Sequence, residues 1–140
     1  QFYLATKYQY GKDIQKDERQ AFAWYKAAAD QGLAVAQLNV GRMLADGMGT
    51  RKDEALARQY FEKAASRGDN RASFNLAMME EKKKNYMGAY QWYELSTRDG
   101  MLDNKVITLS EGKKTALAAN LTQEQIRQAR DRADRWIQAQ

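Results

Sequence analysis

The side chains that most often carry chemistry are sparse in this chain. Its 140 residues include no histidine and no cysteine, so neither a Ser-His-Asp triad nor a Cys-His pair can form. Adjacent carboxylates remain, at Asp17/Glu18, Asp53/Glu54 and Glu80/Glu81. Paired carboxylates act as acid and base in glycosidases, but the first two pairs recur at one position of a repeat, where an acid caps a helix. We therefore predict that the chain is not an enzyme and has no catalytic residue, metal site or cofactor.

Other motifs also favour structural roles. Gly47-Met48-Gly49 has no preceding strand and no following G-K-S/T, so it is not a phosphate loop. The Lys82–Lys84 run could contact phosphate or an anionic membrane, although three lysines in a short hairpin are usually a solvated turn. A second set could stack on bases or sugars; it comprises Trp24, Tyr25, Tyr60, Phe61, Trp92 and Tyr93. Because these rings recur at one register, we predict that they pack between helices.

An internal repeat positions all of these residues. Residues 17–32, DERQAFAWYKAAADQG, return as residues 53–68 after 36 positions and as residues 85–100 after a further 32. Self-similarity at such a period is the signature of stacked helical repeats. The chain has no proline and 44% apolar residues, so each repeat is predicted to be a pair of helices in an all-α protein.

Residue types at the ends of each copy predict where the helices begin and end. Asp17, Asp53 and Asn85 occupy equivalent positions, at which an N-cap oxygen can accept from a free backbone N–H. Gly32, Gly68 and Gly100 end the copies, as a left-handed residue after a helix would. The third repeat lacks four residues between its two helices and has Glu81-Lys82-Lys83-Lys84 there. Its hairpin should therefore be tighter and lack a glycine turn.

The middle repeat shows both helical faces. Residues 34–46 are predicted to form its first helix, with one face made of Ala36, Val40, Gly41 and Leu44. The second helix, starting at Asp53, has a stripe of small and aromatic residues: Ala57, Tyr60, Phe61, Ala64 and Ala65. Small residues admit a close neighbour, and rings fill the space between helices.

These residues resemble the Sel-one-like repeat family, a relative of the tetratricopeptide repeats. The residues that carry the resemblance are Ala36, Val40-Gly41, Leu44, Gly47-Met48-Gly49-Thr50, Asp53, Ala57, Tyr60-Phe61, Lys63-Ala64-Ala65 and Gly68. The likeness covers nearly all of residues 2–100. It implies a right-handed α-solenoid of helix-turn-helix repeats and, as in many family members, an adaptor rather than a catalyst. Leu44 and Thr50 depart from the usual Tyr and Val of the pattern.

The chain beyond Gly100 is predicted to close the solenoid. Residues 103–119 could form a further helix that uses apolar positions including Val106, Leu109 and Leu117. Thr122-Gln123-Glu124-Gln125 has the form of a capping box, and the helix after it presents a stripe of Ile126, Ala129, Ala133, Trp136 and Ile137. We predict one domain, 1–140, truncated at its N-terminus, with repeats at about 1–33, 34–69 and 70–101 and a closing helix pair at about 102–140.

The function we predict from this architecture is binding of a protein or peptide. In solenoids of the resembled type the first helix of each repeat lines the concave surface. The candidate partner-binding residues on these helices are Tyr3, Thr6, Tyr10, Leu38, Asn39, Arg42, Phe74, Asn75, Met78 and Lys82. Leu38 and Phe74 could instead pack between repeats. The leading hypothesis is a scaffold or adaptor, and the alternative is an inhibitory or immunity-type protein that clamps a partner enzyme.

Charge and hydropathy restrict the classes of partner and the cellular locations that we expect. There are 23 Lys and Arg against 18 Asp and Glu, but the signs alternate along the chain, which favours solubility over nucleic-acid binding. No apolar run is long enough to span a membrane. The N-terminal edge, with Phe2, Tyr3, Tyr8 and Tyr10, lacks a polar cap, which indicates self-association or missing repeats. The resemblance implies a bacterial periplasmic or secreted protein, with the cytoplasm left open.

Overall fold

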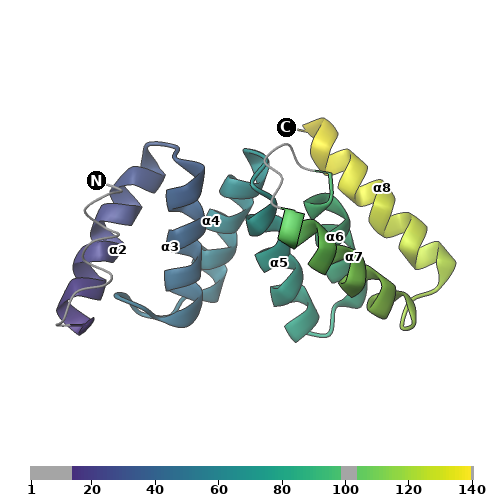
Figure 1. Ribbon diagram of the computed structural model, residues 1–140, viewed down its shortest axis with the longest axis horizontal. Coiled ribbons are helices and arrows are strands. Elements are labelled where there is room, and N and C mark those ends of the chain that lie inside the picture. Colours follow the sequence, from purple (N-terminus) through teal and green to yellow (C-terminus); the bar gives the residue numbers. More distant parts are fainter. Residues whose placement is uncertain (1–13, 99–103, 140) are drawn as a thin grey trace. The chain divides into compact units, whose positions relative to one another are not determined.

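Every regular element in the described part of the chain is an α-helix (Figure 1). The computed structural model describes residues 14–98 and 104–139. In these ranges it contains α2 (Ile14–Asp30), α3 (Ala34–Asp46), α4 (Glu54–Ser66), α5 (Asn70–Lys82), α6 (Tyr86–Ser96), α7 (Asn104–Ala118) and α8 (Gln123–Ala139). The predicted all-α class is thereby confirmed. No helix in these ranges is long and apolar enough to cross a membrane.

The chain forms two compact units, residues 1–64 and residues 65–140. In the first unit α2 packs against α3. Gly41 of α3 lies directly under the ring of Phe61 in α4, and a Cβ added to Gly41 would come within 2.6 Å of that ring. The hydroxyl of Tyr60 donates to Asp30 Oδ1 at 3.1 Å and so joins α4 to α2. The small and aromatic residues of the predicted stripe therefore do set the close helix packing of this unit.

Two of the predicted helix-ending glycines have the expected conformation. Gly32 has φ 93° and Gly68 has φ 85°, values that an L-residue rarely adopts. After α2, Leu33 N donates to Ala28 O at 3.3 Å and Gly32 N donates to Ala29 O at 2.9 Å. This pair of bonds is the Schellman motif, which satisfies carbonyls left free at the helix end. Gly100 lies outside the described residues.

Two of the three predicted N-caps are also present. Leu56 N donates to Asp53 Oδ1 at 3.0 Å, and Gly88 N donates to Asn85 Oδ1 at 3.1 Å. The prediction for Asp17 was wrong, because α2 already begins at Ile14 and places Asp17 in its first turn. An acid in that turn still interacts favourably with the helix dipole. An aspartate is therefore favourable in the first turn as well as at the N-cap.

In the second unit α6 is central and packs against α5, α7 and α8. Tyr93 of α6 is fully buried and meets Phe74 of α5 edge to face at a centroid distance of 5.4 Å. Trp92 meets Trp136 of α8 in the same manner at 5.0 Å. Of the six rings predicted to pack, Tyr25, Tyr60, Phe61, Trp92 and Tyr93 are buried and Trp24 is half-buried. Packing is therefore confirmed as their role.

The hairpin between α5 and α6 is tight and has no glycine. Lys84 takes the left-handed conformation instead, with φ 63°. Its N–H donates to Glu81 O, and Asn85 N donates to Glu80 O, both at 2.9 Å. The side chain of Asn85 also donates to Glu80 Oε2 at 2.7 Å. The predicted shortening of this connection is thus achieved by one strained lysine and one bridging asparagine.

The last two helices agree with prediction except at two apolar positions. α7 buries Val106, Ser110, Lys114 and Leu117, which form a single stripe. Leu109 lies off this stripe and is 54% exposed, so its prediction as a core residue was wrong. The capping box is confirmed, because Gln125 N donates to Thr122 Oγ1 and Thr122 N donates to Gln125 Oε1. Ala129 and Ala133 of α8 are fully buried, whereas Ile137 is exposed.

Candidate functional site

The predicted partner-binding residues of the first two repeats have different surroundings. Tyr3, Thr6 and Tyr10 lie outside the described residues. On α3, Leu38 is only 1% exposed, so it is a packing residue and we leave it out of the partner-binding surface. Asn39 is half-buried on the same helix. Arg42 is exposed, so α3 presents one cation and one amide to solvent among these candidates.

On α5 the four candidates also divide. Phe74 is half-buried against Tyr93. Asn75 Nδ2 donates to Arg71 O at 2.8 Å within its own helix, so this donor is already engaged. Met78 is 42% exposed, and Lys82, one turn further along the helix, is exposed as well. The outward surface of α5 is therefore made by Met78 and Lys82.

A shallow hollow joins this surface to α7. It has a volume of about 260 Å³ and is lined by Met78, Glu81, Lys82 and Lys113. Glu81 Oε1 accepts a hydrogen bond from the buried Tyr93 hydroxyl at 2.8 Å, and Glu81 Oε2 lies 3.8 Å from Lys113 Nζ. Burial, together with this hydrogen bond and the charge of Glu81, raises the pKa of the Tyr93 phenol. The phenol therefore stays protonated and keeps one oxygen of Glu81 engaged.

The outward side of α7 continues this surface. Lys105, Leu109 and Lys113 are four residues apart, a spacing that keeps side chains on one side of a helix. A second hollow, of about 470 Å³, is lined by Asn104, Lys105, Thr108 and Leu109. We name the surface formed by Met78, Lys82, Lys105, Leu109 and Lys113 the α5–α7 face. It presents three ammonium groups around two exposed apolar side chains.

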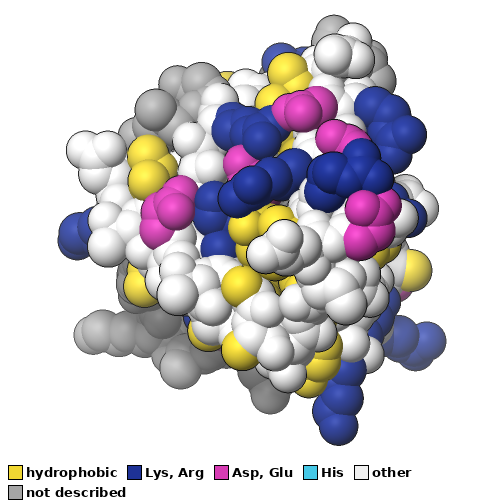
Figure 2. All heavy atoms as spheres, turned by 90° about the vertical axis from the view of Figure 1, so that its right-hand side faces the viewer, with side chains coloured by type: hydrophobic (Ala, Val, Ile, Leu, Met, Phe, Trp, Pro, Cys, Tyr) yellow, Lys and Arg dark blue, Asp and Glu magenta, His cyan; other side chains and the backbone are white. Residues whose placement is uncertain are grey.

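A larger groove lies between α7 and α8, both of which pack on α6. Its volume is about 950 Å³, and its lining includes Tyr90, Lys114, Ile126 and Arg130. Figure 2 shows the side of the molecule on which α8 lies in Figure 1; basic and acidic side chains gather there in one area with hydrophobic groups between them. Size alone would make this groove the first candidate for a binding site.

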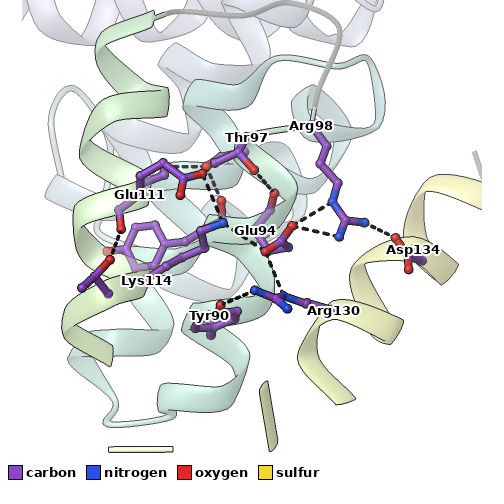
Figure 3. A network of polar contacts seen from close by, with 12 residues as sticks. Tyr90, Glu94, Thr97, Arg98, Glu111, Lys114, Arg130 and Asp134 are labelled. Atoms are coloured by element: carbon purple, nitrogen blue, oxygen red, sulfur yellow. Dashed lines mark hydrogen bonds and ion pairs between the residues drawn. The ribbon is translucent and has the colours of Figure 1, made fainter. Parts of the chain in front are cut away.

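The charged groups of this groove are arranged around Glu94, a buried residue of α6 (Figure 3). Lys114 Nζ reaches from α7 and donates to Glu94 Oε1 at 3.0 Å. Arg98 Nε donates to Glu94 Oε2 at 2.9 Å. Burial by itself would raise the pKa of Glu94, but the hydrogen bonds and charges of Lys114 and Arg98 outweigh it and lower that pKa. Glu94 is therefore ionised and balances the positive charges of Lys114 and Arg98 inside the unit.

The outer members of the network are paired as well. Lys114 Nζ also lies 3.2 Å from Glu111 Oε1, and Arg98 forms an ion pair with Asp134 of α8. Arg130 of α8 is held more loosely, 3.6 Å from Glu94 Oε1 and 3.4 Å from the Tyr90 hydroxyl. Because its charges are largely used within the chain, the network joins α6, α7 and α8 and leaves little for a ligand.

Sequence reasoning missed this network because its partners are far apart in the chain. Lys114 is 20 residues from Glu94, and Asp134 is 36 residues from Arg98. One signal was available: Lys114 falls on the buried stripe of α7, where a charge requires a partner. Within residues 14–98 and 104–139 no group of three or more His, Cys, Asp or Glu side chains could hold a metal ion.

The successive helices of residues 14–98 and 104–139, joined by short connections, have the arrangement of a helical-repeat protein of the α-solenoid class. A family model described as "Sel1 repeat" matches residues 1–33, 34–69 and 71–101. The chain belongs to the Sel1 repeat family, which confirms the resemblance and the solenoid fold. Sel1 repeats generally mediate protein–protein interaction and are generally non-catalytic.

Two solved structures are similar to this chain. One is a protective antigen of uropathogenic Escherichia coli strains that displays an SLR fold. It has a TM-score of 0.83 and 26% sequence identity, over 97% of this chain and 29% of that chain. The other is a Sel1 repeat protein from Oxalobacter formigenes, with a TM-score of 0.60 and 34% identity over 69% of this chain and 41% of that chain. Both extend well beyond the part that this chain matches.

Two curated relatives carry the name chitin synthase regulator SKT5. The protein from Malassezia restricta is 38% identical over 63 residues, which are 45% of this chain and 4% of that protein. The protein from Saccharomyces cerevisiae is 40% identical over 59 residues, which are 42% of this chain and 8% of that protein. The likeness is therefore confined to a small part of each relative.

Proposed function

We propose that this chain is a protein-binding module in which each unit offers first-helix residues to a partner, the half-buried Asn39 and exposed Arg42 of α3 in the first unit and the exposed Met78 and Lys82 of α5 in the second. The observation that carries the proposal is the 42% exposure of Met78. A methionine adapts its shape to varied partners and is over-used at binding surfaces. Its neighbour Lys82 supplies a charge beside it, so that α5 offers both burial and electrostatic attraction to a partner.

The general role of Sel1 repeats in protein–protein interaction supports this proposal. Leu38 and Asn75 are left out of the proposed surface, the first because it is buried and the second because its amide donor is used within α5.

A second candidate is regulation of a partner enzyme. The observation that favours it is the name of the two curated relatives, which are regulators of an enzyme, chitin synthase. Such regulation needs only a surface that binds the enzyme, so it uses the same residues as a scaffold would. It corresponds to the clamping of an enzyme that the sequence suggested as an alternative.

The test is capture of the partner on two surface variants of the whole chain. The partner is identified with the wild-type chain, purified and titrated against Asn39→Ala/Arg42→Glu and Met78→Ala/Lys82→Glu. We expect each variant to weaken binding at least about tenfold, the loss of about 1.4 kcal/mol. Lys52→Glu is the control, since Lys52 is exposed in the α3–α4 connection and lies outside the proposed surface.

Binding that is unchanged in both variants would show that the first-helix residues are not the partner surface. If the purified partner is an enzyme, its turnover with and without the chain separates the two candidates. A change in turnover supports regulation, and unchanged turnover in the bound complex supports a scaffold.

A further inference from the structure

We infer that Met78 is an oxidation site: a peroxide converts its thioether into a sulfoxide, which weakens the binding of the partner, and reduction of the sulfoxide restores that binding. The inference rests on the proposed function, because Met78 is the apolar contact that α5 offers to the partner. It adds to that function a reversible chemical modification of the same site.

Methionine supplies all the sulfur in this chain. The sequence has six methionines and no cysteine, so a peroxide that reaches the protein finds no thiol to oxidise. Oxidation of a methionine thioether to the sulfoxide is reversible, because dedicated reductases return it to the thioether. The methionine that reacts first is the one whose sulfur the peroxide can approach most easily.

Exposure distinguishes Met78 among the methionines that the structure describes. Met78 is 42% exposed, whereas Met43 of α3 is only 2% exposed. The other three, Met48, Met79 and Met87, are half-buried. Met78 and Met79 are neighbours in one helix, so the difference between them results from packing and not from the local sequence. A peroxide can therefore reach Met78 from solvent more easily than it can reach the other four.

The surroundings of Met78 stabilise the oxidised side chain. Met78 lines the hollow of about 260 Å³ together with Glu81, Lys82 and Lys113, so it borders charged groups. Lys82 is exposed and follows Met78 by four residues, which places both side chains on the same side of α5. A sulfoxide oxygen accepts hydrogen bonds, and a lysine ammonium group donates them. The oxidised side chain can therefore accept from Lys82, which engages this charge within the chain.

The reaction transfers one oxygen atom and two electrons. The Met78 sulfur attacks one oxygen of hydrogen peroxide, a sulfur–oxygen bond forms and the oxygen–oxygen bond breaks. The second oxygen leaves as hydroxide, takes the proton of the transferred oxygen and becomes water. Sulfur is thereby oxidised by two electrons and the peroxide is reduced by two. In the reverse reaction a dithiol supplies two electrons and two protons and becomes a disulfide, and the oxygen leaves as water.

Oxidation changes what α5 offers to the partner. The sulfoxide replaces an adaptable apolar side chain with a polar one, and burying a polar group in a complex is unfavourable unless it is hydrogen-bonded there. We therefore expect binding to weaken about tenfold or more, because the burial of one methionine is lost. The fold is retained, since the core of α5 is made by other residues, such as Leu76 and Ala77, which are fully buried.

The site is tested first without a partner. The whole chain is treated with increasing amounts of hydrogen peroxide, and the sulfoxide at each methionine is quantified by mass spectrometry, with fragment ions separating Met78 from Met79. We expect Met78 to be oxidised first and Met43 last of the five described methionines. Circular dichroism should show that the helices are retained when Met78 alone is oxidised. Earlier oxidation of another described methionine, or loss of the helices at this stage, would overturn the inference.

Binding of the purified partner is then measured before and after oxidation of the chain, with the peroxide removed by catalase before the partner is added. The ratio of the two dissociation constants is compared between variants, so the effect of a substitution on binding itself cancels. We expect a ratio of about ten or more for the wild type. Treatment with the two stereospecific methionine sulfoxide reductases and a dithiol should return the affinity to its starting value.

Three variants assign the response to one sulfur. Met78→Leu has a side chain of similar volume without sulfur and should not respond to peroxide. Met79→Leu, the matched control at the neighbouring position, should respond as the wild type does. Met78→Gln carries a polar group before any oxidation, so it should bind weakly from the start and not respond. A response of Met78→Leu equal to that of the wild type would assign the loss to another methionine and overturn the inference.

Failure of this inference can be told apart from failure of the proposed function. Binding that is unchanged by complete oxidation of Met78, but is lost in Met78→Ala/Lys82→Glu, leaves the proposed function standing and removes only its regulation. A partner that is insensitive both to oxidation and to this double substitution removes the α5 surface as well.

Discussion

Lys114 Nζ of α7 lies 3.0 Å from Glu94 Oε1 of α6, and the two side chains are only 11% and 9% exposed. Taking two charges out of water is costly, and their attraction offsets that cost only with good geometry and further hydrogen bonds. Glu94 obtains those bonds from Arg98 on its second oxygen. The pair is thus a condition for packing α7 onto α6, and removing one member leaves the other buried without its counter-charge.

Glu94→Gln should therefore lower the free energy of unfolding by about 3 kcal/mol, the usual cost of breaking a buried ion pair from one side. The measurement is urea denaturation followed by far-ultraviolet circular dichroism at pH 7. The matched control is Glu62→Gln in α4. Glu62 pairs with Arg58 at 3.4 Å in a much more exposed position, so the control should change stability by about 0.5 kcal/mol or less. Equal effects of the two substitutions would contradict the role given to Glu94.

The contribution of Glu94 should also disappear in acid. Burial opposes its ionisation, but Lys114 and Arg98 prevail and lower the pKa of Glu94 in the folded chain. A carboxylate whose pKa is lowered by folding stabilises the protein above its unfolded pKa of about 4.3, and this stability is lost as the pH falls through the folded pKa. The difference in unfolding free energy between wild type and Glu94→Gln should thus shrink steadily below about pH 4. A difference that stays constant from pH 7 to pH 3 would rule out this linkage.

Gly49→Ala should destabilise the first unit. Gly49 has φ 74°, and an added Cβ would come within 2.1 Å of the backbone oxygen of Glu18 in α2. The left-handed conformation alone costs an alanine about 1 kcal/mol, and the backbone must shift as well, so we expect a loss of about 2 kcal/mol or more. Thermal unfolding provides the measurement. Gly112→Ala in α7 is the control, because no atom lies within 4 Å of its added Cβ, and it should gain up to about 1 kcal/mol.

Lys84→Gly should stabilise the second unit. With φ 63°, Lys84 occupies a region in which an L-residue is strained by about 1 kcal/mol, and glycine removes that strain. The expected gain is about 0.5 kcal/mol after the greater freedom of glycine in the unfolded chain is counted. Lys83→Gly, at the neighbouring position with φ −82°, has no strain to relieve and should not stabilise. Comparison of the two midpoints in urea tests the assignment, and a larger gain for Lys83→Gly would oppose it.

Local features of the fold could be read from the sequence because they depend on residues close together in the chain. The cap at Asp53 and the capping box at Thr122 each need only residues within one turn, and both are present. The same reasoning failed at Asp17, since the pattern of one turn does not reveal where a helix begins further upstream. Repeats add information by alignment, which is why the packing of Tyr60 and Phe61 was also predictable.

The binding surface was only partly predictable, for a different reason. Exposure depends on what neighbouring helices cover, and Leu38 and Met78 are both apolar residues of first helices. Only the structure separates them, with Leu38 buried and Met78 open. Leu109 was predicted to face inward because it is apolar, whereas Lys114, one of the charged residues of α7, is the one that is buried. Because Lys114 pairs with Glu94, this helix buries a charged residue while the apolar Leu109 stays exposed.

The unequal connections within the repeats have a consequence for how such chains can change in length. The α5–α6 connection closes through backbone bonds of Lys84 and Asn85, whereas in the longer α3–α4 connection Gly49 lies against the backbone of α2. The longer connection of the second repeat therefore brings its loop against α2, a helix of the preceding repeat. An insertion at this point therefore adds a contact with the preceding helix and changes packing as well as loop length.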